Sequence, residues 1–219
     1  MAYEWSTICN HGRLGRSGMA TIAVTVSAVA LGALGWLAAG LAVASIGAAA
    51  LGLVRRRFWP ALGILYATLP CLSLIWLRDG ARGVAAVLWV FALVWAADTL
   101  AYGFGRILGG PRLAPRISPK KTWAGLGGAV AGALAVAAAF WMLGLGAGGW
   151  SLVVLSGGLA LVEQAGDLLE SAFKRRFGVK DSSRLIPGHG GVLDRVDGLV
   201  AVVLVVAVMR LAGLGFLMP

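Results

Sequence analysis

The sequence predicts an all-α integral membrane protein, and three observations support this prediction. Hydrophobic residues make up 59% of the 219 residues and charged residues only 13%, so a water-soluble domain would lack the polar residues to cover its surface. The apolar residues form runs of about 20, the length that a helix needs to cross a hydrocarbon core of about 30 Å. These runs are apolar on every side, whereas strands of a membrane barrel alternate. We therefore expect a polytopic helical bundle.

Seven apolar runs are long enough to count as transmembrane helices, and the second is the weakest. They cover residues 20–37, 38–54, 59–77, 83–104, 123–143, 151–172 and 198–217. The 33 glycines suit close packing of helices in lipid. Neither an internal repeat nor a separate soluble domain is visible, so we expect one membrane-embedded domain over residues 1–219.

The cations set the orientation of these spans. Because short basic loops stay in the cytoplasm, we expect the 105–122 and 173–197 loops to face it. The net charge of +10 comes with no basic run interleaved with aromatic residues, so we expect no nucleic-acid partner. The cations on the predicted cytoplasmic side are Arg13, Arg16, Arg55 to Arg57, five between Arg106 and Lys121, and six between Lys174 and Arg195; the other side has Arg78 and Arg82.

Acidic residues inside the sixth predicted span are candidates for a site, because such residues are costly in lipid. Glu163, Asp167, Glu170 and Lys174 are spaced 4, 3 and 4 residues apart, which places them within an arc of about 60° on a helix. Buried ion pairs with neighbouring helices explain Glu163 nearly as well as function does. For Asp167 a functional role is favoured, because a basic, glycine-rich loop follows.

That loop ends with two more carboxylates. Asp194 and Asp197 are spaced i, i+3 where the chain re-enters the last span, so both can face one point. Together with Asp167 they would suit Mg²⁺, a hard cation that binds carboxylates and substrate phosphates while it keeps some water. We expect a metal site formed by these three residues.

A second candidate region surrounds the 105–122 loop. Asp98, Tyr102 and Gly105 share a helix face, and Asp98 either orients a ligand or pairs with a loop cation. Glycines at 103, 105, 109 and 110 and prolines at 111, 115 and 119 predict a break in the helix. The next helix follows a polar stretch, where its free N–H groups and dipole favour an anion. A phosphate site is the natural interpretation, although membrane anchoring also explains two lysines. The residues of this stretch are Ser118, Lys120, Lys121 and Thr122.

The stretch "KDSSRLIPGHGGVLDRVD", residues 180–197, concentrates polar chemistry in an otherwise apolar chain. Gly188, Gly190 and Gly191 let the backbone approach a ligand. His189 can donate to a phosphate oxygen, and nearby cations can neutralise a polyanion. Those cations are Lys174, Arg175, Lys180, Arg184 and Arg195.

These residues resemble the signature of the phosphatidate cytidylyltransferases, or CDP-diacylglycerol synthases. The signature runs Ser-x-x-Lys-Arg, Lys-Asp, Pro-Gly-His-Gly-Gly and Asp-Arg-x-Asp. The "GDLLES" and "ADTLAYGFGRILGG…ISPKKTWAG" stretches are also similar to the family, so the resemblance covers at least residues 91–205, the expected catalytic core. The signature is met by Ser171, Lys174, Arg175, Lys180, Asp181, Pro187 to Gly191, Asp194, Arg195 and Asp197.

The resemblance implies a nucleotidyltransferase that converts CTP and phosphatidate to CDP-diacylglycerol and pyrophosphate in the inner membrane, with its active site facing the cytoplasm. It implies Mg²⁺, with room for a second, monovalent cation. CTP, phosphatidate and the lipid bilayer are then the expected partners, and a homodimer is left open. The implied catalytic residues are Lys174, Arg175, Lys180, Asp181, His189 and Arg195. The implied substrate-binding residues are Asp98, Tyr102, Ser118, Lys120, Lys121, Thr122, Ser171, Gly190 and Gly191.

Two departures and three rivals accompany this interpretation. Ala124 stands where the family commonly has an acidic or polar residue, and the family has further spans before a Glu-Trp pair like Glu4-Trp5, so we expect a truncated N-terminus.

A CTP-dependent polyprenol or phytol kinase would move phosphate rather than the nucleotide. The CDP-alcohol phosphotransferases share "DRVDG" but not the residues expected after Gly198. A transporter would place acidic residues near mid-membrane on several helices, and only Glu163 approaches that depth.

Overall fold

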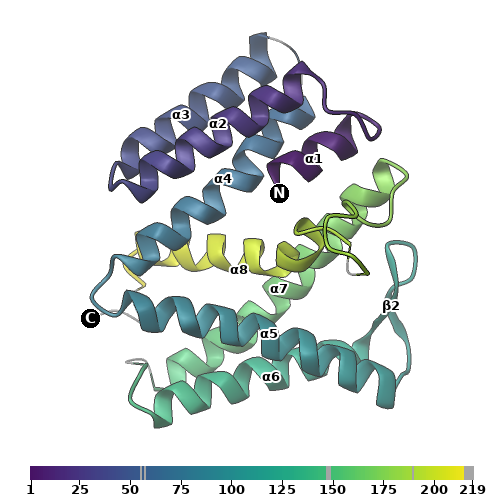
Figure 1. Cartoon of the computed structure of the whole chain (residues 1–219). Coiled ribbons are helices and arrows are strands. Elements are labelled where there is room, and N and C mark those ends of the chain that lie inside the picture. The colour runs from purple at the N-terminus through teal and green to yellow at the C-terminus, as the bar shows by residue number, and fades with distance from the viewer. Residues whose placement is uncertain (55, 57, 147–148, 189, 215–219) are drawn as a thin grey trace. The chain divides into compact units, whose positions relative to one another are not determined.

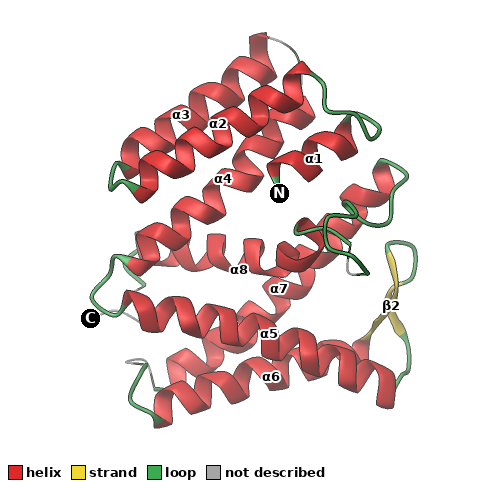
Figure 2. Cartoon of the chain, in the orientation of Figure 1, coloured by secondary structure: helices red, strands yellow, loops and turns green. Residues whose placement is uncertain are grey.

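The computed structural model describes residues 1–214 with the exception of 55, 57, 147, 148 and 189, and it confirms the all-α class (Figure 1). Apart from one short hairpin, the elements of the described residues are helical (Figure 2). They are α1 (Ala2–Cys9), α2 (Arg16–Ala33), α3 (Leu37–Ala49) with a π-helical turn (Ala50–Val54), α4 (Phe58–Arg78), α5 (Gly83–Ile107), β1 (Arg112–Ala114), β2 (Ser118–Thr122), α6 (Trp123–Met142), α7 (Trp150–Arg176) and α8 (Leu193–Leu211).

Each of the seven predicted spans falls on a helix. Within the described part of the chain, five helices are long and apolar enough to cross a membrane: α2, α4, α5, α6 and α7. The helix of the second predicted span, α3, is short even with its π-helical turn, in line with its ranking as the weakest. The helix of the last predicted span, α8, is not among these five; it begins at Leu193, before the predicted start, and the predicted residues 215–217 lie outside the described residues. The chain is a multi-pass membrane protein.

The chain forms two compact units. Unit 1 comprises Met1–Trp76 and Phe173–Val196, and unit 2 comprises Leu77–Ala172 and Asp197–Pro219. Their boundaries fall within α4, α7 and α8. The predicted site residues are therefore divided by sequence position between two bodies, each of which is considered by itself below.

Two hydrophobic clusters lie among the described residues of unit 1. In the first, small residues let helices approach: a Cβ added to Gly40 would lie 2.5 Å from the carbonyl oxygen of Ala28. The second is aromatic and packs α1 against α4, the end of α7 and the start of α8. Trp5 stacks on Phe173 with ring centroids 3.9 Å apart, and its indole N–H donates to the carbonyl of Trp59 at 2.8 Å. Leu193, fully buried, completes this cluster. It fixes α1 beside the polar loop.

Unit 2 depends on glycines that bring α5 and α6 into backbone contact. Gly125, Gly128 and Gly132 are spaced 3 and 4 residues apart and so lie on one face of α6. A Cβ on Gly125 would lie 2.9 Å from the carbonyl oxygen of Ala101, and one on Gly132 would lie 2.6 Å from that of Ala96. The predicted role of glycine in close packing is confirmed at these positions.

The predicted interruption of the helix after the 83–104 span is present, but it begins slightly later than predicted, because α5 continues through Gly103 and Gly105 to Ile107. A glycine weakens a helix without ending it, and at Gly105 a Cβ would lie 3.1 Å from Thr122 Oγ1. The connection then forms an antiparallel hairpin, in which Arg112 pairs with Thr122 (Figure 2). Its turn closes with Ile117 N–H donating to the carbonyl of Ala114 at 3.1 Å, across a proline that favours such a turn.

Candidate active site

Unit 2 contains a pocket of about 430 Å³ between α5, β2, α6 and α7. Its lining includes all six substrate-binding residues that the sequence predicts around the first loop, namely Asp98, Tyr102, Ser118, Lys120, Lys121 and Thr122. Asp167, a predicted metal ligand, lines the same pocket. Residues separated by up to 69 positions therefore meet at one concave surface, as expected of a ligand site.

Lys121 is the cation that connects the wall of this pocket to α7. Its Nζ lies 2.6 Å from Asp167 Oδ2 and donates to Gln164 Oε1 at 2.8 Å. The amide nitrogen of Gln164 donates in turn to Glu163 Oε2 at 2.8 Å. Glu163 is buried, and its carboxyl group is close enough to Asp98 to interact with it. The chain of contacts from Glu163 to Lys121 holds the ammonium group at the pocket.

Thr122 has a structural task that the sequence prediction did not assign. It is the N-cap of α6, and its Oγ1 accepts from the backbone N–H of Gly125 at 3.0 Å. The cap satisfies one of the N–H groups that were expected to face an anion.

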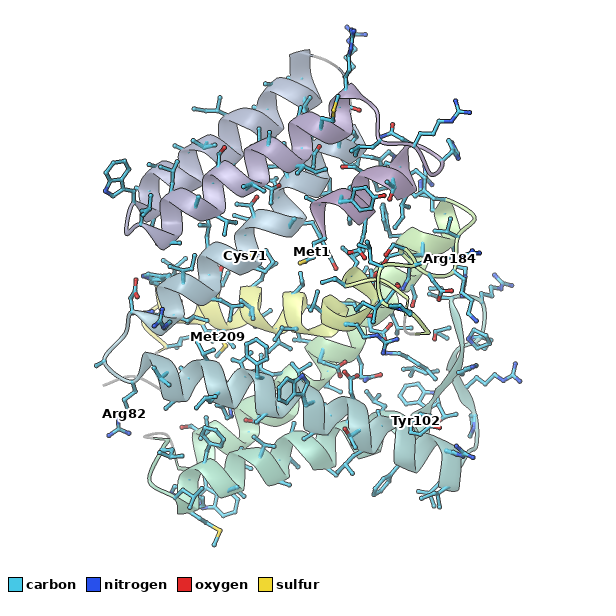
Figure 3. All side chains as sticks on the ribbon, viewed as in Figure 1. Met1, Cys71, Arg82, Tyr102, Arg184 and Met209 are labelled. Atoms are coloured by element: carbon cyan, nitrogen blue, oxygen red, sulfur yellow. The ribbon has the colours of Figure 1, made fainter. Side chains whose placement is uncertain are left out.

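Tyr102 accepts from Arg106 Nη1 at 2.8 Å on the exposed face of α5 (Figure 3). Arg106 also lines the pocket, which therefore has a third cation beside Lys120 and Lys121.

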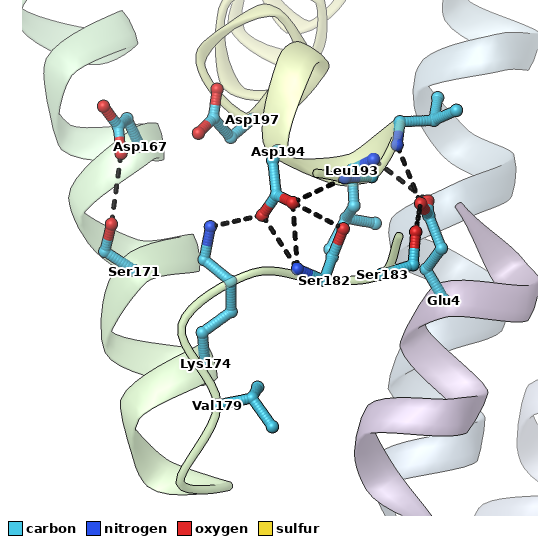
Figure 4. Close-up of polar contacts among 12 residues, drawn as sticks. Glu4, Asp167, Ser171, Lys174, Val179, Ser182, Ser183, Leu193, Asp194 and Asp197 are labelled. Carbon is cyan, nitrogen blue, oxygen red and sulfur yellow. Dashed lines mark hydrogen bonds and ion pairs between the residues drawn. The ribbon is translucent and has the colours of Figure 1, made fainter. Parts of the chain in front are cut away.

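Unit 2 also brings Asp167 close to Asp197. A Cβ added to Gly166 would lie 2.6 Å from Ala201 Cβ and 3.1 Å from the carbonyl oxygen of Asp197, so α7 and α8 are in direct contact there. The two carboxylates are near enough to repel each other (Figure 4). Asp167 also accepts from Ser171 Oγ at 3.2 Å. Two adjacent carboxylates that repel each other are suited to a divalent cation.

The described residues contain no group of three or more His, Cys, Asp or Glu side chains arranged to bind a metal. A divalent cation at Asp167 and Asp197 would therefore complete its shell with water and substrate oxygens. This is the usual arrangement for Mg²⁺, which binds through one or two carboxylates together with phosphates. The donor set fits that ion.

Asp194, in unit 1, occupies a different environment. Its Oδ1 receives Lys174 Nζ at 2.6 Å, and its Oδ2 accepts from Ser182 N–H and Ser182 Oγ, each at 2.9 Å, and from Gly191 N–H at 2.8 Å (Figure 4). Burial acts to raise the pKa of Asp194, but the bonds from Lys174, Gly191 and Ser182 outweigh it and place the pKa below the ordinary value of 3.8. The carboxylate is anionic at neutral pH and already has several donors.

In the predicted glycine loop, other groups of the protein contact the backbone at Gly190 and Gly191. Gly190 has φ +78 and pairs with Ile186, whose N–H donates to the Gly190 carbonyl at 2.9 Å. A Cβ on Gly191 would overlap the side chains of Ser182 and Glu4. The expected close approach to the Gly191 backbone is therefore made by Glu4 and Ser182.

The other predicted catalytic residues of unit 1 lie mostly at the surface. Lys174 is buried, whereas Arg175, Lys180, Asp181 and Arg195 are exposed. Arg175 donates to the carbonyl of Val179 at 3.1 Å, which fixes the end of α7. His189 lies outside the described residues.

Three polar residues with contacts to the predicted site were missed from the sequence. Gln164 lies beside Lys121, Ser182 beside Asp194, and Glu4 contacts the 183–193 segment. Ser182 carries no signal among neighbouring polar residues. The sequence context could have identified the other two. Gln164 adjoins the acidic stripe of an apolar helix, and Glu4 belongs to the Glu-Trp pair at the start of the chain.

The fold and these two polar clusters define a multi-pass helical membrane protein with paired lysines and aspartates at sites suited to a polyanion. Comparison with known proteins then gives its family. The sequence model of the cytidylyltransferase family matches residues 5–212, and the chain belongs to that family.

Three relatives agree with this assignment. The phosphatidate cytidylyltransferase of Brucella abortus biovar 1 (strain 9-941) is 45% identical over 214 residues, which cover 92% of this chain and 76% of that protein. The phosphatidate cytidylyltransferase of Haemophilus influenzae is 46% identical over 131 residues, which cover 58% and 46%. That of Staphylococcus aureus (strain COL) is 41% identical over 122 residues, which cover 55% and 47%.

Proposed function

We propose that this chain transfers the cytidylyl group of CTP to phosphatidate and releases pyrophosphate, at the cytoplasmic face of the inner membrane. The observation that carries the proposal is the unit 2 pocket. There, Lys121 and Lys120 line one cavity with Asp167, in a chain whose relatives are named for this reaction. Neither a kinase nor a transporter is favoured by any observation.

In the proposed reaction a phosphate oxygen of phosphatidate attacks the α-phosphorus of CTP. A bond forms between that oxygen and the α-phosphorus, and the bond from the α-phosphorus to the bridging oxygen of the β-phosphate breaks. Because the lipid phosphate is already an anion, the reaction needs little base, and catalysis rests on position and charge neutralisation. Lys120, Lys121 and Arg106 supply that positive charge at the pocket. Acyl chains enter sideways from the bilayer.

We further propose that Asp167 and Asp197 hold Mg²⁺. When bound, the ion supplies charge neutralisation for the phosphates. Lys121, which now neutralises Asp167, is then available to a phosphate oxygen. The assignment of Asp194 as a third ligand, the second monovalent cation and the homodimer stay predictions.

Labelled CTP tests the proposed reaction. The purified chain in phosphatidate-containing vesicles should incorporate label from [α-³²P]CTP into lipid, and none from [γ-³²P]CTP. A kinase would give the opposite pattern, and ion flux without labelled lipid would indicate a transporter. Chelation of Mg²⁺ should stop incorporation.

Asp167→Asn tests the metal assignment. It should abolish labelled product because the cation loses a ligand, while Asp79→Asn, on the exposed loop between α4 and α5, should retain wild-type turnover. The Mg²⁺ concentration for half-maximal activity should be unchanged in Asp79→Asn. Wild-type turnover of Asp167→Asn would refute the role of this carboxylate.

A further inference from the structure

Glu4 is a fully buried carboxylate in α1, a short helix that no predicted site includes. Its side chain is 0% exposed. Burial of an anion is costly unless hydrogen bonds compensate it, so the position of Glu4 requires an explanation from its surroundings.

Apart from an ion pair with the α-ammonium group of Met1, the hydrogen bonds that the Glu4 carboxylate accepts come from the loop before α8 and from the first residue of α8. Its Oε1 accepts from Ser183 Oγ and from the backbone N–H of Val192, each at 2.7 Å. Its Oε2 accepts from the backbone N–H of Leu193 at 3.0 Å (Figure 4). Burial acts to raise the pKa of Glu4, but the Ser183 hydroxyl, the α-ammonium group of Met1 at 3.1 Å from Oε2 and the Leu193 N–H together place it below its ordinary value. The carboxylate is therefore an anion that binds both ends of the 183–193 segment.

The same segment supplies the donors of Asp194. Ser182 and Gly191 bond to the Asp194 carboxylate, and each is next in sequence to a residue that bonds to Glu4. Asp194 in turn holds Lys174 at 2.6 Å. The two carboxylates therefore bond to neighbouring residues of one loop, at Ser182 and Ser183 and again at Gly191 and Val192.

We propose that Glu4 is a positioning residue for the nucleotidyl transfer, acting through the 182–193 segment on Asp194 and Lys174. This inference rests on the proposed function. A variant without the Glu4 carboxylate keeps Lys174, the predicted phosphate-binding cation. The loop that holds Asp194, the partner of Lys174, loses its hydrogen bonds to α1 in that variant. The expected consequence is weaker CTP binding, with binding of phosphatidate unchanged.

Two substitutions and one control measure the effect. Glu4→Ala removes both acceptor oxygens. Glu4→Gln keeps the shape and one acceptor, but its amide NH₂ faces a loop donor, so it should restore part of the function. Thr7→Ala, on the same helix, removes a hydroxyl whose bond stays inside α1, and it should behave as wild type.

The first readout is steady-state kinetics with each substrate varied. Since buried hydrogen bonds to a charged group are worth enough to change an equilibrium by roughly tenfold, Glu4→Ala should raise KM for CTP by roughly tenfold. KM for phosphatidate should not change, and Glu4→Gln should fall between Glu4→Ala and wild type. A fall in kcat at constant KM, without partial rescue by Glu4→Gln, would mean a purely structural role and would overturn the inference.

The second readout is limited trypsin digestion without substrate, which does not depend on activity. Arg184 is exposed and lies between the two anchored ends of the loop (Figure 3). Cleavage after Arg184 should be several times faster in both Glu4 variants than in wild type and Thr7→Ala. Equal cleavage would overturn the inference. If Glu4→Ala does not fold, Glu4→Gln alone decides.

The two proposals fail in different ways. A wild-type chain that makes no CDP-diacylglycerol would refute the proposed function, whatever Glu4 does to trypsin sensitivity. An active wild type whose Glu4→Gln variant matches it in both readouts would refute the role of Glu4 alone.

Discussion

The two lysine–aspartate pairs have the same length but different surroundings. Lys174 and Asp194 in unit 1, and Lys121 and Asp167 in unit 2, are each 2.6 Å apart. The side chains of the first pair are 9% and 10% exposed, and backbone N–H groups complete the shell of Asp194. Those of the second pair are 15% and 25% exposed, and Asp167 lines the pocket.

This difference separates a fixed pair from an exchangeable one. Asp194 is bonded to the loop that carries it, so a new ligand would have to replace several good donors. Among the described residues, Asp167 contacts the Lys121 ammonium group and the Ser171 hydroxyl, and it lines a cavity that can admit a competing cation or phosphate. The comparison indicates that Asp194 organises its loop and that Asp167 meets ligands.

The largest expected effect is that of Asp194→Asn. The substitution removes the carboxylate that neutralises a buried lysine, and breaking a buried pair costs about 3–5 kcal/mol. We expect a large loss of stability in thermal unfolding of the detergent-solubilised protein, together with loss of labelled product. Asp167→Asn is the matched comparison and should lose at most about 1 kcal/mol. Equal losses in the two variants would remove the distinction between the pairs.

Gln164→Leu should have an intermediate effect that is confined to unit 2. It removes the acceptor of Lys121 and the donor to Glu163, so Lys121 keeps Asp167 but loses its second support. KM for CTP should rise roughly threefold to tenfold, the range of a single hydrogen bond. Ser156→Ala, elsewhere on α7, removes a hydroxyl bonded to Leu152 and serves as control. An unchanged KM in Gln164→Leu would show that Asp167 alone positions Lys121.

The smallest effect concerns pH and unit 1. The pKa values of Glu4 and Asp194 lie below their ordinary values of 4.5 and 3.8. The contribution of each carboxylate to the stability of the folded protein is therefore fully present above its ordinary pKa. That contribution is lost as the pH falls through the lowered pKa of the folded state. The difference in melting temperature between wild type and Glu4→Gln should be constant from about pH 7 to about pH 5 and shrink below about pH 4. A difference that grows in acid would contradict the direction of the Glu4 shift.

Prediction from sequence succeeded where a property is local. The placement of α5, α6 and α7 follows from apolar runs, and the pocket residues around Lys121 follow from a polar stretch between two helices. It placed the end of α5 a few residues too early, because Gly103 and Gly105 were grouped with the later glycines and prolines that do interrupt the helix. Gly105 lies against Thr122 and Gly125, and no local rule contains the information that these residues would be its neighbours.

The amino-acid sequence by itself determined that this chain is a helical membrane protein of the cytidylyltransferase family, because segment length, hydropathy and motif spacing are properties of contiguous residues. Only the tertiary structure decided which carboxylate is fixed and which faces a cavity. It also decided that the Glu4 carboxylate accepts hydrogen bonds from a loop that lies nearly 190 residues away along the chain. Such pairings depend on how distant segments pack, and burial and hydrogen-bond geometry exist only once they have done so.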